Sequence, residues 1–309
     1  MPMLTRRSAL MAAAAAPFAP ALIRATPAHA EAALQGPSMA MFNRFTLGGF
    51  EITTLLAGTR TVEKPQEIFG MNVDAETFGQ VSADNFIPVD KAQFFFTPTL
   101  VNTGSELVLF DTGLAPDSII APLAAAGITP DQVDTVVLTH MHGDHIGGLV
   151  GEAGPTFANA RYVTGAVENN YWAGAANEGY EAQVRPLLEK TTFLDDGGSV
   201  ASGITAMAAF GHSPGHMAYR LESNGAQLVV SADTANHYVW SLAYPDWEVK
   251  FDADKAAAAA TRMAVFAMLA ADKVPFIGYH MPFPGMGYVE ARAEGFRYVP
   301  ASYQMMMNG

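Results

Sequence analysis

The sequence predicts an α/β protein, because short apolar segments with strand patterns alternate with helical segments along most of the chain. Polar residues recur directly after the predicted strands, and the densest group is His140-Met141-His142-Gly143-Asp144-His145. The chain has 309 residues, of which 50% are hydrophobic, with 28 Gly and 19 Pro. This length and composition suit one large globular domain or two small ones.

The first thirty residues have the pattern of a removable export signal. Arg6 and Arg7 precede an Ala-rich, weakly apolar run, and Ala28-His29-Ala30 forms an A-x-A cleavage site. We therefore expect a twin-arginine signal peptide over residues 1–30, one folded domain over 31–309 and a periplasmic location. Prolines inside the apolar run argue against the alternative, a permanent membrane anchor, so we expect none in the mature form.

The mature chain is expected to be strongly acidic. The signal carries three arginines and no acidic residue, so its removal changes the formal net charge from −13 to −16. Such a charge argues against nucleic acid and anionic lipid as partners. The chain has no cysteine, so any metal must be held by His, Asp and Glu.

The predicted elements of the first half are strands, one long loop and a short helix. Strands are expected at 50–56, 94–96, 100–101 and 107–110, with the last two joined by a turn at 103–105. Residues 60–92, with scattered Pro, Asp and Gln, are expected to form a long loop. A short helix over 117–126 precedes the β-branched strand 134–139, which leads into the histidine group.

The second half is expected to repeat this scheme. Strands are predicted at 161–164, 204–210, 218–221, 228–231 and 274–278. A helix that includes Tyr171 and Trp172 follows the first of them. The Ala-rich segment 253–271 has high helix propensity, and Asp252 is its expected N-cap.

The histidine group has the chemistry of a metal site. In an extended segment alternate side chains share a side, so His140 and His142 point the same way, and Gly143 can turn the chain to aim Asp144 and His145 nearby. Neutral imidazole suits Zn, Fe, Mn or Co, and the carboxylate allows a second ion to share the cluster. Three surface histidines on a loop are the alternative. It is a weak one, because three of the chain's eight His fall within six residues.

Further His and Asp residues follow other predicted strands. His212 lies in the turn Gly211-His212-Ser213-Pro214-Gly215-His216, Asp233 follows the strand at 228–231, and His280 follows the last strand. An isolated Asp after a strand is usually a turn residue. With the histidine group, however, these residues complete a set of five His and two Asp, namely His140, His142, Asp144, His145, His212, Asp233 and His280.

These motifs resemble the metallo-β-lactamase superfamily. The H-x-H-x-D-H signature stands at 140–145, the G-H-[ST]-P-G-H turn at 211–216, and Asp233 and His280 follow in the same order. The resemblance implies a four-layer αβ/βα sandwich, in which two mixed β-sheets lie face to face with helices outside and metals along one sheet edge.

The resemblance also implies a dinuclear centre with two divalent ions, for which Zn is the first expectation and Fe, Mn and Co are accepted. Its two ligand groups would be His140, His142 and His212 for one ion, and Asp144, His145 and His280 for the other, with Asp233 bridging. Asp111 and His216 are expected to support the ligands from behind. His237 is left out of the ligand set.

A two-metal mechanism follows from this ligand set. A hydroxide shared by the two ions is the expected nucleophile, since coordination lowers the pKa of water from near 16 to roughly 7. The ion of Asp144, His145 and His280 would polarise the substrate's carbonyl or phosphoryl oxygen. Asp144 and Asp233 are the expected catalytic carboxylates, and Asp144 could carry a proton to the leaving group. The sequence has no nucleophile elbow and no thiol for a covalent mechanism.

The C-terminal segments 279–288 and 295–300 resemble the tail of the methyl parathion hydrolase branch, and segments 45–51 and 100–105 are also similar to that branch. This resemblance implies small apolar substrates: lactones, aryl esters and, in some cases, organophosphate triesters. Candidate pocket residues are Phe94, Phe95, Phe96, Trp172, Tyr238, Phe283 and Met286.

The leading expectation is a hydrolase of neutral, apolar lactones or esters with phosphotriesterase activity as a side reaction. A phosphotriesterase and an acyl-homoserine lactonase are alternatives, although the second group places Tyr where this chain has Asn236. A β-lactamase is disfavoured because Gly215-His216 stands where that group tends to have Asp-Asn. A metal-binding protein without turnover is an alternative from a different class. The apolar, loop-rich N-terminal half could support a homodimer.

Overall fold

The computed structural model describes residues 34, 36 and 38–302. The chain divides into two units, Met1–Met39 and Ala40–Gly309, and every element described below belongs to the second. The expected signal peptide and its cleavage site lie outside the described residues. Among the helices in the described part of the chain, none combines the length and the apolar character needed to cross a bilayer.

Two seven-stranded sheets form the framework of the second unit. The first sheet has the order β1-β2-β5-β6-β7-β10-β11, with β6, β7, β10 and β11 parallel to one another and the other neighbours antiparallel. Its strands are β1 Phe42–Leu47, β2 Phe50–Leu55, β5 Thr99–Asn102, β6 Leu107–Phe110, β7 Thr135–Leu138, β10 Arg161–Gly165 and β11 Thr191–Leu194.

The second sheet follows the chain in order, from β12 to β18. Only the neighbours β15 and β16 are parallel among its strands. The strands are β12 Ser199–Ala201, β13 Ile204–Ala208, β14 Met217–Ser223, β15 Ala226–Ala232, β16 Phe276–Gly278, β17 Met286–Ala291 and β18 Phe296–Pro300. Both sheets are therefore mixed.

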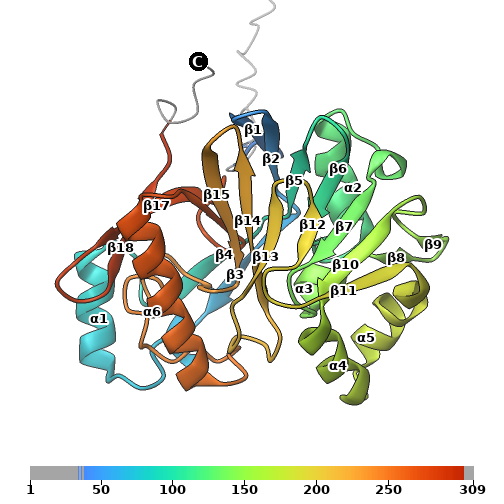
Figure 1. Ribbon diagram of the computed structural model, residues 1–309. Coiled ribbons are helices and arrows are strands. Elements are labelled where there is room, and N and C mark those ends of the chain that lie inside the picture. The colour runs from blue at the N-terminus through green and yellow to red at the C-terminus, as the bar shows by residue number, and fades with distance from the viewer. Residues whose placement is uncertain (1–33, 35, 37, 303–309) are drawn as a thin grey trace, which may run out of the picture. The chain divides into compact units, whose positions relative to one another are not determined.

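The two sheets pack face to face, and helices cover their outer sides (Figure 1). Val137 of the first sheet and Tyr219 of the second belong to one buried apolar cluster between the sheets. Leu123 and Tyr180 bring α2 and α5 onto the outer side of the first sheet, and Phe266 brings α6 onto the second. The helices are α1 Ala75–Asp84, α2 Pro116–Ala125, α3 Gly143–Ile146, α4 Ala166–Gly174, α5 Glu178–Gln183 and α6 Lys255–Asp272. The predicted four-layer fold class is confirmed.

The prediction of a long loop over 60–92 is wrong. This segment holds most of β3 Gly58–Glu63, all of α1 and the start of β4 Lys91–Phe96, and β3 pairs with β4 as a separate antiparallel hairpin. Asp74 caps α1, because its side chain accepts a hydrogen bond from the Thr77 amide at 2.7 Å. The pattern was hard to recognise because β3 has no fully buried residue. Short elements complete the fold: β8 Val150–Gly151, β9 Gly154–Pro155, and 3-10 helices Pro65–Glu67, Pro130–Gln132 and Arg185–Lys190.

The expected N-cap of the long C-terminal helix is also wrong by two residues. Asp254 caps α6, since its side chain accepts a hydrogen bond from the Ala257 amide at 3.0 Å. Asp252 is instead buried below the helix start and contacts the metal-ligand candidates, as described below. The other predicted strands and helices lie where expected to within a few residues.

Candidate metal centre

The predicted metal ligands meet at one edge of the two sheets. α3 follows β7, the turn at 211–216 joins β13 to β14, and Asp233 and His280 come after β15 and β16. The backbone amide of Met217 donates to the carbonyl oxygen of Thr139 at 2.9 Å, which joins the beginning of β14 to the loop after β7. This hydrogen bond holds together two of the four segments that carry the predicted ligands.

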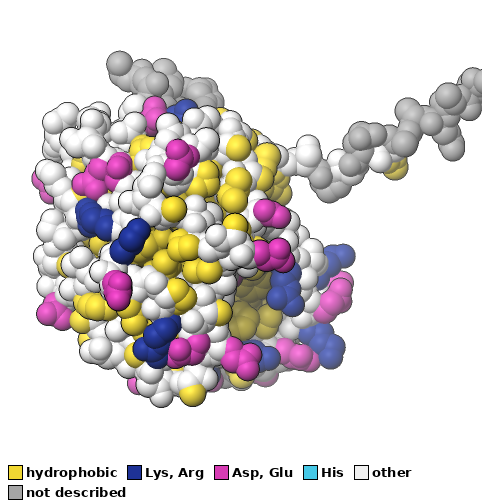
Figure 2. All heavy atoms as spheres, turned by 90° about the vertical axis from the view of Figure 1, so that its right-hand side faces the viewer, with side chains coloured by type: hydrophobic (Ala, Val, Ile, Leu, Met, Phe, Trp, Pro, Cys, Tyr) yellow, Lys and Arg dark blue, Asp and Glu magenta, His cyan; other side chains and the backbone are white. Residues whose placement is uncertain are grey.

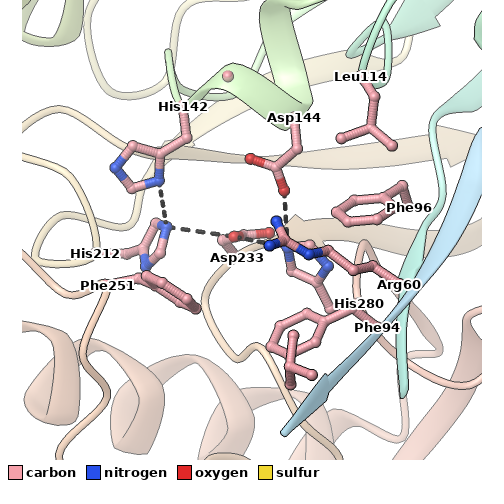
Figure 3. Close-up of a pocket in the computed structure, with 12 residues that line it drawn as sticks. Arg60, Phe94, Phe96, Leu114, His142, Asp144, His212, Asp233, Phe251 and His280 are labelled. Atoms are coloured by element: carbon pink, nitrogen blue, oxygen red, sulfur yellow. Dashed lines mark hydrogen bonds and ion pairs between the residues drawn. The ribbon is translucent and has the colours of Figure 1, made fainter. Parts of the chain in front are cut away.

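The first group consists of His140, His142 and His212. His140 Nε2 and His212 Nε2 each lie 3.0 Å from His142 Nδ1. Figure 3 shows a nitrogen of the His142 ring pointing at a nitrogen of the His212 ring. Three ring nitrogens this close, all within 4.8 Å of one another, suit coordination of a shared ion.

The second group consists of Asp144, His145 and His280, and Asp233 lies between the groups. His280 Nε2 is 3.4 Å and His145 Nε2 is 3.7 Å from Asp144 Oδ2. Asp233 Oδ2 lies 3.3 Å from His212 Nε2 and 3.2 Å from His280 Nε2, so one carboxylate reaches both groups. The structure thus brings together all seven predicted ligands.

Two buried atoms in this cluster fit bound cations. His145 Nε2 and Asp233 Oδ1 have no hydrogen-bond partner among the described residues. Leaving such buried polar atoms without a partner costs free energy, whereas a divalent ion between them would satisfy both. A donor set of imidazole nitrogens and carboxylate oxygens accepts Zn, Fe, Mn or Co. The residues present therefore fit the expected ions.

The charges of the cluster also suit a cation. Burial lowers the pKa of His142 to about 4, and it lowers the pKa of His140 well below its usual range. Burial raises the pKa of Asp144, but His145 and His280 outweigh it and lower it to about 2. Burial lowers the pKa of His280, but Asp233 and Asp144 outweigh it and raise it to about 9. Since ligating imidazoles must be neutral, metal binding has to displace the proton of His280.

Asp111 supports His145 from behind. Its Oδ2 lies 2.8 Å from His145 Nδ1 and accepts the hydroxyl hydrogen of Thr139 at 2.8 Å, while Oδ1 accepts the Thr139 amide at 2.9 Å. With Nδ1 engaged, Nε2 of His145 is left to face the cluster. Asp111 and Ala232 both adopt left-handed backbone conformations, with φ of 61° and 45°. For residues other than glycine this is strained, and here it occurs at two loops that carry the cluster.

His216 lies beside the cluster but uses both ring nitrogens for the backbone. Its Nδ1 donates to the Ala209 carbonyl at 3.1 Å, and its Nε2 accepts the amide hydrogen of Asp233 at 3.1 Å. No lone pair remains for a metal, so His216 fixes the loop that presents Asp233. This position matches the supporting role expected from the sequence.

The structure shows a buried ion pair behind His212 that the sequence prediction missed. Asp252 Oδ1 lies 3.0 Å from His212 Nδ1, and Arg262 Nη1 donates to Asp252 Oδ2 at 2.7 Å. Arg262 also donates to the carbonyls of Pro245 and Trp247. The only signal in the sequence was a single arginine in an otherwise Ala-rich, apolar helix segment.

Glu168 is a second missed residue, and it joins the two histidine loops. Its side chain is fully buried on α4. Oε1 accepts the Met141 amide at 2.9 Å and the Trp172 indole N–H at 2.7 Å. Oε2 accepts the Ser213 hydroxyl at 2.7 Å and the Gly215 amide at 2.9 Å. Met141 lies between two ligand candidates and Ser213 beside a third, so this carboxylate holds both loops.

A cavity of about 420 Å³ opens onto the cluster (Figure 3). Its walls are mostly apolar, and Arg60 is the one Lys or Arg side chain among the described residues that line it. The wall residues beyond the cluster are Arg60, Val62, Phe94, Phe96, Leu114 and Phe251. The cavity therefore offers a largely apolar space next to the expected ions.

Of the seven pocket candidates, only Phe94 and Phe96 line this cavity. Phe95 points to the other side of β4, because side chains alternate along a strand, and lies with Tyr238 in a second cavity. Met286 is buried between the sheets. Trp172 packs behind His142, with ring centres 5.9 Å apart, and Phe283 is absent from the lining. These five residues were predicted to line the substrate pocket, and they do not line the cavity at the cluster.

The cluster is not open on the side of the domain that carries α4 and α5. Figure 2 shows hydrophobic and charged side chains on this face, and no histidine side chain is visible there among the described residues. Access to the cluster is therefore through the cavity beside the β3–β4 hairpin.

The proteins to which this chain is similar include one thioesterase by sequence and two hydrolases by fold. Over 133 residues, or 42% of this chain, the sequence is 30% identical to the atrochrysone carboxyl ACP thioesterase of Aspergillus terreus (strain NIH 2624 / FGSC A1156), and the match spans 36% of the length of that relative. AidC, a dizinc quorum-quenching lactonase solved with the product N-hexanoyl-L-homoserine, is 26% identical with a TM-score of 0.78, covering 86% of this chain and 98% of that chain. Hydrolase AbOPH has a TM-score of 0.80 at 24% identity, covering 86% of this chain and 99% of that chain.

The family model described as the metallo-beta-lactamase superfamily matches residues 97–272, which is more than half of the chain. The match includes six of the seven residues of the cluster, and His280 follows it. The fold, the cluster and this match agree, and the chain belongs to the metallo-β-lactamase superfamily, a family of metal-dependent hydrolases.

Proposed function

We propose that the protein is a dinuclear metal-dependent hydrolase that cleaves apolar lactones or esters. The observation that carries this proposal is the cavity of about 420 Å³, in which aromatic and aliphatic walls open directly onto His142, Asp144, His212, Asp233 and His280. A space of this size accepts a small organic substrate with its reacting group at the cluster and its apolar part against the walls.

Two divalent ions held by the cluster would supply hydroxide at neutral pH and polarise the substrate's carbonyl oxygen. The chain's own carboxylates then have separate tasks. The side chain of Asp144 is 25% exposed, whereas that of Asp233 is 3% exposed. Asp144 can therefore reach substrate and carry a proton to the leaving group, while Asp233 is confined to holding the two ligand groups together.

Two further observations support lactones or esters. Hydrolysis of either releases a carboxylate, and the guanidinium of Arg60 lies in the cavity wall near Asp144 and His280, where it can attract that anion (Figure 3). The fold also resembles that of AidC, a lactonase by name, and part of the sequence is similar to a thioesterase. All three reactions release a carboxylate by attack at a carbonyl carbon.

Phosphotriester hydrolysis is a second candidate, and the aromatic walls favour it. Phe94, Phe96 and Phe251 surround the opening to the cluster and could stack on an aryl leaving group. A dedicated acyl-homoserine lactonase is less well supported, because the amide of Asn236 donates to Asp233 at 2.8 Å while Tyr238 lies in the second cavity. No phenol at either position reaches the space above the cluster.

The location of the protein in the cell is inferred from its N-terminal sequence and not from its fold. We propose that residues 1–30 direct twin-arginine export and that the folded, metal-loaded domain acts in the periplasm. Cell fractionation of a full-length chain and an Arg6→Lys/Arg7→Lys variant tests this: the variant is expected to stay in the cytoplasm. That the protein forms a homodimer stays a prediction, which the molar mass measured by light scattering would test.

The function is tested with purified protein loaded with Zn, Mn or Co. The substrates are a panel of γ- and δ-lactones, p-nitrophenyl esters, a dialkyl aryl phosphate and a cephalosporin. We expect the highest kcat/KM on a lactone or ester, and loss of this activity in His142→Ala and Asp233→Ala but not in the exposed control Asp131→Ala. Absence of lactone and ester turnover with the metals intact would contradict the proposal, and turnover confined to the phosphate or the cephalosporin would favour those alternatives.

A further inference from the structure

A second cavity, of about 540 Å³, lies on the opposite side of the β3–β4 hairpin from the metal centre. Side-chain alternation separates the two spaces. Arg60, Val62, Phe94 and Phe96 line the metal cavity, whereas the residues between them in sequence face the second one. The residues of the hairpin that line the second cavity are Thr61, Lys91, Ala92, Gln93 and Phe95.

The wall of the second cavity includes a largely buried histidine, His237, with a ring nitrogen that is available as a hydrogen-bond donor. His237 is only 8% exposed, and its Nδ1 accepts the backbone amides of Val239 and Trp240, each at 3.1 Å. The ring hydrogen must therefore be on Nε2, for which the described residues provide no partner. Burial lowers the pKa of His237 to about 3, so the ring is neutral at ordinary pH and keeps this donor.

Two more donors surround the same space, and the lining carries no acidic side chain among the described residues. Tyr238 contributes a phenol, and Lys91 contributes an ammonium group that forms no ion pair in the described part of the chain. The chain has a net charge of −13, yet the described lining places His237, Tyr238 and Lys91 around this cavity without a carboxylate. Its polar groups are complementary to an anion with oxygen acceptors.

The remaining walls are apolar. Ile87, Pro88, Phe95, Trp240 and Pro282 provide aliphatic and aromatic surface, and the volume falls within the usual range for small-molecule sites, roughly 300–1,000 Å³. An occupant must therefore combine an apolar body with one anionic end. A small carboxylic acid has that composition, since its carboxylate accepts hydrogen bonds and its chain or ring can replace water at the walls.

We propose that this cavity is a second binding site, distinct from the metal centre, for a small apolar carboxylate such as a medium-chain or aryl carboxylate. The carboxylate accepts from His237 Nε2 and Tyr238 and is attracted by Lys91, and the apolar part lies against Phe95 and Trp240. This inference does not depend on the reaction catalysed at the metals.

The second site would also touch the metal centre at one residue. The ring of His280 lines both cavities, and its Nδ1 donates to the carbonyl of Phe95 at 2.8 Å. A bound carboxylate therefore lies against Phe95, whose backbone orients a metal-ligand candidate. This contact makes the site a place at which a carboxylate, including a reaction product, can act on the metal centre.

The test is calorimetric titration of hexanoate and benzoate into the metal-loaded protein, with hexanamide as a neutral analogue. Lys91→Met and Tyr238→Phe should each weaken hexanoate binding about fivefold, the effect of losing an exposed ionic contact or one hydrogen bond. Arg60→Met is the comparison variant, because it removes a cation from the metal cavity only. It should weaken carboxylate binding in the metal cavity and leave unchanged the binding step that Lys91→Met weakens.

Hexanamide should bind more weakly than hexanoate to the native protein, and this difference should shrink in Lys91→Met. Binding that is weakened by Arg60→Met and unaffected by Lys91→Met and Tyr238→Phe would overturn the proposal, because the carboxylate would then be in the metal cavity. Equal affinity for hexanamide and hexanoate would overturn the proposed anion. Both substituted residues lie outside the candidate metal ligands, so loss of the metals does not confuse the result.

Discussion

Glu168 provides the sharpest test of how the metal centre is built. Its buried carboxylate accepts four hydrogen bonds from Met141, Trp172, Ser213 and Gly215, at 2.7 to 2.9 Å. In Glu168→Gln, one oxygen becomes an NH2 group, so two donors lose their acceptor. Each buried donor left without a partner costs about 1–3 kcal/mol, so we expect the free energy of unfolding to fall by roughly 2–6 kcal/mol.

The same substitution should weaken metal binding. Met141 lies between His140 and His142, and Ser213 follows His212, so an amide in place of either oxygen releases one of these two loops and loosens at least one ligand candidate of the first group. Loss of a group that orients ligands typically costs a factor of about 10–100 in metal affinity. We expect a decrease of this size in Zn affinity, measured by competition with a chromogenic chelator, together with the lower stability in urea.

Two variants complete the experiment. Glu152→Gln changes an exposed glutamate in the same way and should alter neither the free energy of unfolding nor the Zn affinity. Ser213→Ala removes one of the four donors without introducing an amide, and should cost about 1 kcal/mol if Glu168→Gln proves too unstable to purify. A Glu168→Gln protein that loses less than about 1 kcal/mol and binds Zn as tightly as the native protein would refute the reasoning.

Three further predictions concern other groups. Asp252→Asn leaves Arg262 buried without its counter-ion and should lower the free energy of unfolding, measured in urea, by about 3–5 kcal/mol. Asp254→Ala removes only a helix cap and should lower it by about 1 kcal/mol. A larger loss in Asp254→Ala than in Asp252→Asn would contradict the assignment of Asp254 as the cap and Asp252 as the counter-ion. His237 has a folded-state pKa of about 3, below its unfolded value of 6.5, so the unfolded chain binds the extra proton and stability should fall as the pH decreases below 6.5. Between pH 7 and 5 this residue should account for about 2 kcal/mol, and urea titrations of His237→Asn should lack that part of the slope. Arg60→Met should weaken inhibition by a carboxylate product about fivefold, with little change in kcat for a neutral ester; unchanged inhibition constants would rule out contact between Arg60 and the product.

The fold class and the candidate ligand set could be predicted from the sequence, because both depend on patterns of residues that are close together along the chain. His140, Asp233 and His280 each follow a strand, and the motifs at 140–145 and 211–216 identify the set to which they belong. The β3–β4 hairpin was missed because its first strand is polar and largely exposed, so it lacks the apolar alternation that identifies strands. Asp252 and Asp254 are both good helix caps, and only the packing decides between them.

The pocket wall and the supporting groups depend on relations that local patterns do not contain. Phe94, Phe95 and Phe96 are equivalent in sequence, and the register of β4 against β3 decides which two face the metals. Nothing in the sequence around Glu168 distinguishes it from the other glutamates, because its four hydrogen-bond donors come together only in the folded protein. These residues acquire their roles through long-range contacts.

The supporting groups show that the imidazoles are oriented before any ion binds. For four of the five histidines, the second ring nitrogen already has a partner behind the cluster: Thr139 Oγ1 for His140, Asp111 for His145, Asp252 for His212 and the Phe95 carbonyl for His280. Each partner accepts a hydrogen from Nδ1, which leaves Nε2 directed at the cluster. An ion that displaces the remaining ring proton of His280 therefore meets ligands whose ring positions are already set, and less free energy is lost in ordering them. Three buried carboxylates also support the centre: Asp111 binds the segment of His140 to His145, Asp252 binds His212, and Glu168 binds both of these segments.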